Sequence, residues 1–186
     1  MHLSWRQLPN FITGLRIVLI VPIAWSLARL RFDATIVLFG VAALSDAADG
    51  FLAKRFGWQS ELGAMLDPIA DKLLLATVFV TLSVLGLIPW WLTAVAVARD
   101  LIIVLGAISY RLCIGPINAH PSTVSKLNTL TQVAFILAVI ARQRFELPPA
   151  WLLTALGATV FLTVVVSGID YVVTYGRRAL QPEAGP

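Results

Sequence analysis

The sequence predicts an all-α fold, a polytopic membrane protein with six transmembrane helices, and three observations support this class. Hydrophobic residues make up 59% of the 186 residues and charged residues only 13%, with a mean hydropathy of +0.86. A soluble domain is about 45–50% apolar and about 25% charged, so an ordinary water-soluble domain is excluded. Apolar stretches of roughly 20 residues, the length that crosses a bilayer, recur along the chain and are separated by short glycine- and proline-containing segments.

Glycine and proline set the limits of the predicted spans, because both residues interrupt apolar helices. Residues 1–14 are expected to form an amphipathic N-terminal segment, residues 15–175 a six-helix membrane bundle, and residues 176–186 a cytoplasmic tail, together one domain. Breaks fall at Gly86–Pro89, Gly115–Pro116 and Pro148–Pro149. The expected spans are Leu15–Leu30, Ala34–Ala53, Leu62–Leu85, Trp90–Leu112, Ser122–Ala141 and Ala150–Tyr175.

The distribution of charge predicts the orientation in the membrane. Six spans place both termini on one side, where eight basic residues gather against four on the other. Loops rich in lysine and arginine favour the cytoplasm, so the termini and the loop between the second and third spans are expected there, in a bacterial-type inner membrane or its equivalent. The four basic residues on the opposite side are Arg29, Arg31, Arg142 and Arg144.

Tryptophan placement and the remaining composition agree with a membrane protein. Trp58, Trp90, Trp91 and Trp151 fall at predicted helix ends, where an interfacial aromatic belt lies. The single cysteine excludes a disulfide framework. The basic residues form no clustered stretch, so no nucleic acid is expected as a partner.

Four carboxylates stand close to one end of the second and third spans. Asp46 and Asp49 are three residues apart, and Asp67 and Asp71 are four apart, so each pair shares one helix face. A carboxylate at the centre of a span costs about 2.5–3.5 kcal/mol, so a group of four needs a positive partner. Hard oxygen ligands suit Mg²⁺, Mn²⁺ or Ca²⁺, and one or two such ions are the expected partner.

Small residues accompany the acids. Gly50 follows Asp49, and Gly63 lies one turn before Asp67. A glycine costs about 1 kcal/mol in a helix relative to alanine, so these glycines indicate either close helix packing or a place where the phosphate or base of a ligand approaches the backbone.

Three classes of membrane protein would explain acidic residues within the spans of this chain: a transporter, a structural subunit and an enzyme. A cation transporter would spread them along a path and repeat the pattern in two halves, and a structural subunit would pair them with a partner protein. Here the acids cluster at one end of two adjacent spans, beside glycines, and no second copy of the pattern occurs. An enzyme is the favoured interpretation.

The spacing of these residues resembles the signature of the CDP-alcohol phosphatidyltransferases, D-x2-D-G-x2-A-R-x8-G-x3-D-x3-D. Seven of its eight fixed positions are matched between Asp46 and Asp71, and the departure is Lys54 in place of arginine. Lysine retains the charge but loses the bidentate fork that holds phosphate. The segments Leu8–Arg16, Ala98–Asp100 and Pro121–Gln132 are similar to the phosphatidylglycerophosphate synthase and CMP-forming cardiolipin synthase branch.

The resemblance implies a reaction in phospholipid biosynthesis. The phosphatidyl group of CDP-diacylglycerol would pass to a glycerol-type acceptor, glycerol 3-phosphate or phosphatidylglycerol, with release of CMP. Two divalent ions, Mg²⁺ or Mn²⁺, would be the cofactors. Serine or inositol as the acceptor is the alternative. The family also implies a homodimer and an active site that opens to the cytoplasm.

The same resemblance implies roles for individual residues. The metal ligands would be Asp46, Asp49, Asp67 and Asp71, and Asp71 would also be the catalytic base. The CDP moiety would contact Asp49, Gly50, Ala53, Lys54 and Gly63. The acceptor phosphate would contact Arg16, Arg99, Arg111 and Lys126. For Arg99 an internal ion pair with Asp100 is the alternative.

Overall fold

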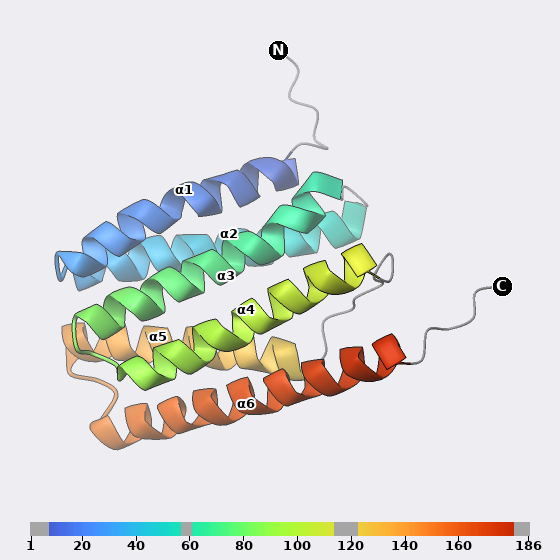
Figure 1. Ribbon diagram of the computed structural model, residues 1–186. Helices are drawn as coiled ribbons and strands as arrows, with labels where there is room; N and C mark the ends of the chain where they lie inside the picture. The colour runs from blue at the N-terminus through green and yellow to red at the C-terminus, as the bar shows by residue number, and fades with distance from the viewer. Residues whose placement is uncertain (1–7, 57–60, 114–122, 181–186) are drawn as a thin grey trace, which may run out of the picture. The chain divides into compact units, whose positions relative to one another are not determined.

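Six α-helices make up the part of the chain that the computed structural model describes, which confirms the predicted all-α class (Figure 1). The structure describes residues 8–56, 61–113 and 123–180, with side chains described for residues 14–45, 69–106, 108–109 and 123–174. The helices are α1 (Leu8–Ala28), α2 (Phe32–Phe56), α3 (Glu61–Val84), α4 (Trp90–Cys113), α5 (Thr123–Phe145) and α6 (Ala150–Leu180).

The helices begin within two residues of the predicted starts except for α1. This helix begins at Leu8, inside the segment predicted to precede the first span, rather than at Leu15. Proline is tolerated in a first helical turn, because the N–H groups there have no intrahelical partner, so Pro9 does not delay the helix. At the other end of the chain, α6 continues to Leu180, five residues beyond the predicted Tyr175. Gly176 weakens a helix by only about 1 kcal/mol and does not stop it.

The described helices form two compact units. Unit 1 comprises Met1–Ile88 and Leu137–Leu147, and unit 2 comprises Pro89–Ile136 and Pro148–Pro186, so one division falls at the turn before α4 and another within α5. In unit 1, α1 packs against both α2 and α3. Figure 1 shows α1 and α3 running in the same direction and α2 in the opposite one. The core of this unit is mostly apolar, with Ile23, Leu27, Phe39, Leu74, Val78, Phe79 and Leu82 buried.

In unit 2, α4 packs side by side with α6 and runs in the same direction (Figure 1). The Tyr171 hydroxyl of α6 donates to the Ile103 carbonyl of α4 at 2.9 Å. The Tyr171 ring crosses α4 at Gly106, where a Cβ atom would lie 2.9 Å from the ring Cε1. The two helices approach this closely because glycine has no side chain at that point.

Two helix ends close with the same backbone motif, in which one residue adopts a left-handed conformation. Leu30 has φ of 56° after α1, and Gly86 has φ of 72° after α3. The next residue in each case donates its N–H to a carbonyl five residues earlier, at 2.8 Å for Arg31 and 2.9 Å for Leu87. Orphan carbonyls of both helices are satisfied in this way. Glycine adopts the conformation readily, whereas leucine adopts it with strain.

Among the residues that the structure describes, two helical segments are long and apolar enough to cross a membrane by length and composition, Thr123–Phe145 and Ala150–Thr174. Gly14–Ala28 and Phe32–Ser45 are shorter apolar helical stretches. Trp90 and Trp91 begin α4, Trp151 lies at the start of α6, and all three are more than half exposed. This confirms the predicted helix-end positions of these tryptophans, while Trp58 lies outside the described residues.

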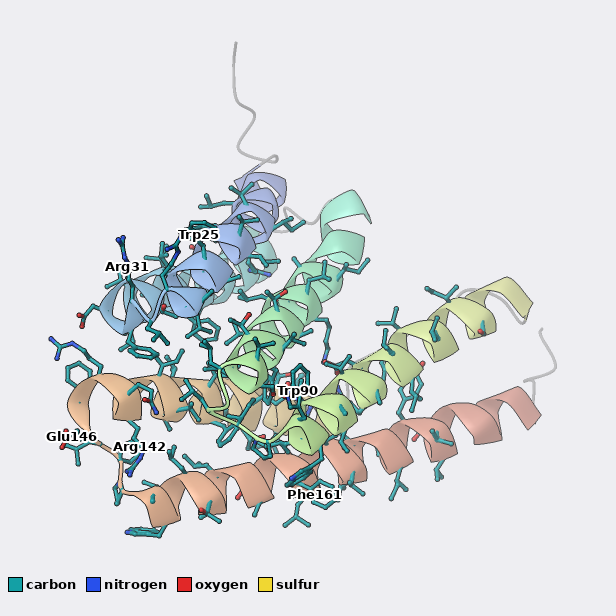
Figure 2. The ribbon with its side chains drawn as sticks, turned by 60° about the vertical axis from the view of Figure 1, so that its left-hand side comes forward. Trp25, Arg31, Trp90, Arg142, Glu146 and Phe161 are labelled. Carbon is teal, nitrogen blue, oxygen red and sulfur yellow. The ribbon has the colours of Figure 1, made fainter. Side chains whose placement is uncertain are left out.

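Basic residues gather at the end of unit 1 that holds the α1–α2 turn. Arg144, in the last turn of α5, donates from Nε to Asp33 Oδ1 at the start of α2. Figure 2 shows Trp25 and Arg31 beside this turn and Arg142 and Glu146 at the C-terminal end of α5. Within unit 1, the segments that carry the four arginines predicted to share one membrane side therefore lie at one end.

Candidate active site

The four aspartates of the motif lie on two helices, α2 and α3, and they form two pairs at similar distances from the helix ends Phe56 and Glu61. Asp46 and Asp71 each lie ten residues from the helix ends at Phe56 and Glu61, about 15 Å along the axis at 1.5 Å per residue. Asp49 and Asp67 lie seven and six residues from the same ends, about 10 Å along the axis. The helices α2 and α3 run in opposite directions (Figure 1), so the motif has one aspartate of each helix at about 15 Å and one at about 10 Å from these ends.

Asp71 is the member of this set whose side chain the structure describes, and it is bound by an arginine from another helix. Arg16 Nη1 of α1 donates to Asp71 Oδ1 of α3 at 2.6 Å, across 55 residues of sequence. The Arg16 side chain is 1% exposed and the Asp71 side chain 36%. The charge of the buried guanidinium is thus compensated by a carboxylate that reaches the surface of unit 1.

The remaining residues of the predicted metal site and CDP pocket have a described backbone and no described side chain. Asp46, Asp49, Gly50, Ala53 and Lys54 lie on α2, and Gly63 and Asp67 lie on α3. Among the side chains that the structure describes, no group of three histidine, cysteine or acidic residues forms a metal site. The predictions for these residues stay predictions.

The donor set fits a pair of Mg²⁺ or Mn²⁺ ions by its chemistry. All four predicted ligands are carboxylates on two neighbouring helix segments, and hard divalent cations prefer such oxygen donors. A carboxylate offers about four acceptor sites, and the hydrogen bond from Arg16 uses one of those of Asp71. The Asp71 side chain is 36% exposed, so it is not enclosed by the protein as Arg16 is.

Arg99 lies at the centre of a buried polar cluster in unit 2 and links three helices. The side chain is 4% exposed, and Nη1 donates to Asp100 Oδ1 on α4 at 2.7 Å. Nη2 donates to Ser125 Oγ on α5 at 2.9 Å and to Ser167 Oγ on α6. The structure therefore contains the internal Arg99–Asp100 ion pair that the sequence offered as the alternative to an acceptor contact. A guanidinium surrounded in this way ties the helices of unit 2 together.

A second polar cluster continues along α5, and the sequence prediction of site residues did not include it. The Thr163 hydroxyl of α6 donates to Asn128 Oδ1 at 3.1 Å, and the Thr131 and Thr163 hydroxyls lie 3.0 Å apart. Asn128 and Gln132 are almost fully buried, at 0% and 1% exposed. Ser125, Asn128 and Gln132 follow each other at intervals of three and four residues, and this helical spacing is the signal by which a polar stripe on one face of α5 could have been found.

The other two predicted acceptor contacts are placed only in part. Lys126 is on α5 with an exposed side chain. Arg111 lies on the backbone of α4, and its side chain is outside the described residues. Neither position tests the predicted contact with an acceptor phosphate.

Comparison with known proteins assigns the family. The profile of the CDP-alcohol phosphatidyltransferases matches residues 6–173, which include helices of both units, so the chain belongs to the CDP-alcohol phosphatidyltransferase family. This confirms the resemblance drawn from the aspartate motif.

Individual relatives fall in the branch that the sequence indicated. The chain is 29% identical to the human "Cardiolipin synthase (CMP-forming)" over 190 residues, which cover 94% of this chain and 63% of the relative. It is 34% identical to the "Probable phosphatidylglycerophosphate synthase" of Mycobacterium tuberculosis over 149 residues, 80% of this chain and 66% of the relative. It is 31% identical to the "CDP-diacylglycerol--glycerol-3-phosphate 3-phosphatidyltransferase" of Blochmanniella floridana over 151 residues, 73% of this chain and 74% of the relative. The chain thus spans just under two thirds of the length of the first two relatives.

Proposed function

We propose that this protein is a membrane-embedded CDP-alcohol phosphatidyltransferase that transfers the phosphatidyl group of CDP-diacylglycerol to a glycerol-type acceptor and releases CMP. The observation that carries the proposal is the motif from Asp46 to Asp71, laid out on two antiparallel helices in a chain that belongs to this family. The acceptor is glycerol 3-phosphate or phosphatidylglycerol, since the named relatives are phosphatidylglycerophosphate synthases and CMP-forming cardiolipin synthases.

The chemistry requires the chain to neutralise a diphosphate and to accept a proton. The hydroxyl oxygen of the acceptor forms a bond to the phosphatidyl phosphorus, the bond from that phosphorus to the oxygen of CMP breaks, and CMP leaves with the electron pair. Two divalent ions held by Asp46, Asp49, Asp67 and Asp71 would supply the positive charge that the diphosphate and the leaving oxygen need. Asp71 would take the proton of the acceptor hydroxyl, a role that its partly exposed carboxylate supports.

The remaining predictions extend this proposal to the CDP pocket and the membrane. Gly50, Ala53, Lys54 and Gly63 would line the nucleotide pocket together with Asp49. All six helices would cross the membrane, with both termini and the active site on the cytoplasmic side, and the protein would work as a homodimer. The apolar character of α5 and α6 and the exposed tryptophans at helix starts support the membrane location.

The test is CMP release by the purified protein in detergent with CDP-diacylglycerol and Mn²⁺ or Mg²⁺. Glycerol 3-phosphate and phosphatidylglycerol are offered in separate reactions, and release with one of them supports the proposal and identifies the acceptor. Release with serine or inositol alone would contradict the glycerol-type acceptor. The absence of release with all four acceptors, from a folded protein, would contradict the proposed activity.

A pair of aspartate variants tests the role of the motif. Asp71→Asn is expected to lower the rate of CMP release by about 10²–10⁴-fold, the usual contribution of a general base. Asp33→Asn is the matched control, because Asp33 lies on the same unit with a side chain that is 71% exposed and paired only with a surface arginine in the described structure. Equal activities of the two variants would refute the role of Asp71.

A further inference from the structure

The burial of Arg16 and its ion pair with Asp71 argue against a direct contact of this arginine with the acceptor. Its side chain is 1% exposed, and it is among the largest fully buried side chains of the described chain. A buried guanidinium is unfavourable unless an opposite charge and hydrogen bonds compensate it. Asp71 supplies that charge at 2.6 Å, so one guanidinium nitrogen of the arginine, Nη1, is committed to a group of the protein.

The two partners of this ion pair differ in exposure. The arginine approaches from the interior of unit 1, and the carboxylate keeps 36% of its side-chain surface exposed. A buried donor therefore holds one carboxylate oxygen of Asp71, while the Asp71 side chain keeps part of its surface exposed.

The heights of the two residues on their helices explain how the pair forms. Arg16 lies eight residues from the start of α1, about 12 Å along the axis, and Asp71 lies ten residues from the start of α3, about 15 Å along the axis. The two helices run in the same direction from the same end of unit 1 (Figure 1). The helix α1 therefore brings a cation to the level of Asp71.

We infer that Arg16 is a positioning residue, which orients the Asp71 carboxylate through its Nη1–Oδ1 hydrogen bond and does not contact the acceptor. The inference rests on the proposed function, in which Asp71 is a metal ligand and the base. Residues that hydrogen-bond a metal-ligating carboxylate hold it in the geometry that the reaction uses. The pair also gives a physical reason for the arginine at the end of the segment Leu8–Arg16, which lies far from the motif in sequence.

The experiment compares Arg16→Lys with Arg16→Gln and with a control on the same helix. Lysine retains the charge and loses the planar fork, whereas glutamine loses the charge. Ser26→Ala is the matched control, because it removes the 2.9 Å hydrogen bond between Ser26 and Thr35 that joins α1 to α2 and leaves Arg16 in place. The measurements are kcat, the KM for each substrate, and the Mn²⁺ dissociation constant of the metal-free protein, followed by electron paramagnetic resonance.

A positioning role predicts a specific combination of results. Arg16→Lys is expected to weaken Mn²⁺ binding and to lower kcat, each by up to about 10–100-fold, with the KM for the acceptor unchanged. The net charge is constant in this variant, so weaker binding reports lost orientation. Arg16→Gln is expected to lose at least as much kcat, and Ser26→Ala is expected to retain wild-type kcat and Mn²⁺ affinity.

Three results would overturn the inference. A raised KM for the acceptor with kcat and Mn²⁺ affinity unchanged would make Arg16 an acceptor contact. Wild-type kinetics and Mn²⁺ affinity in both variants, or failure of both to fold, would leave the pair a structural one. Absence of CMP release by the wild-type protein would instead refute the proposed function. That result differs from the three above because it is measured without any variant.

Discussion

Replacement of Arg99 by alanine measures how much one buried side chain contributes to unit 2. The guanidinium donates to Asp100 at 2.7 Å, to Ser125 at 2.9 Å and to Ser167, so it joins α4, α5 and α6. Breaking a buried ion pair by removal of one partner costs about 3–5 kcal/mol, because the remaining charge loses an opposite charge close to it in a medium of low dielectric constant. We expect Arg99→Ala to lower the free energy of unfolding by about that amount.

A second arginine of the same chain provides the control. Arg144 pairs with Asp33, but their side chains are 49% and 71% exposed. Exposed pairs contribute about 0–1 kcal/mol, so Arg144→Ala is expected to be nearly neutral. Ser167→Ala, which removes a single interhelical hydrogen bond to Arg99, is expected to cost about 0.6–1.7 kcal/mol.

Thermal unfolding in detergent resolves these differences, read from the loss of the folded peak in size-exclusion chromatography. At about 2–4 °C per kcal/mol, Arg99→Ala lowers the midpoint by about 6–20 °C and Arg144→Ala by less than about 4 °C. Equal midpoints for the two variants, together with a raised KM for the acceptor in Arg99→Ala, would refute the structural role. Arg99 would then be the acceptor contact that the sequence first suggested.

Three further predictions test the packing and the cofactor. Gly106→Ala is expected to cost about 1–3 kcal/mol in unfolding free energy, because its Cβ would lie 2.9 Å from the Tyr171 ring, and thermal unfolding measures the loss. Gly86→Ala should lower the same midpoint, at a cost of about 1–2 kcal/mol for a left-handed residue, whereas Leu30→Gly should leave it unchanged or raise it, since strain is relieved there. Chelation of divalent ions is expected to abolish CMP release, and added Mn²⁺ or Mg²⁺ to restore it; activity that survives exhaustive chelation would contradict the proposed cofactor.

Local features of the sequence were sufficient for the class of protein and the position of its helices. Apolar runs and the glycine and proline breaks predicted six helices, five of which begin within two residues of the expected start. The fixed spacing from Asp46 to Asp71 indicated the family, which the profile match over residues 6–173 confirms. These features are local because helix formation, hydropathy and a motif within one helix pair depend on residues that are near one another in sequence.

The partners of the buried charges were predicted only in part: the sequence offered the neighbour Asp100 for Arg99, whereas the distant partners of Arg16 and Arg99 have no local signal. The sequence analysis included Arg16 and Arg99 among the predicted acceptor contacts. An arginine within an apolar span is easily recognised in the sequence, but the sequence does not show which group it binds. The structure pairs Arg16 with a carboxylate 55 residues away, and Arg99 with a serine 68 residues away as well as with its neighbour Asp100.

The sequence by itself predicted the helices, the family and the aspartate motif, whereas the tertiary structure shows which groups the buried cations contact. A charge in an apolar interior takes the partner that packing brings within about 3 Å, and packing depends on which helix faces meet. The steric requirement at Gly106 also depends on packing, because the Tyr171 ring of α6 lies where a side chain at that position would be. Contacts between residues distant in sequence carry no local pattern, so only the folded chain reveals them.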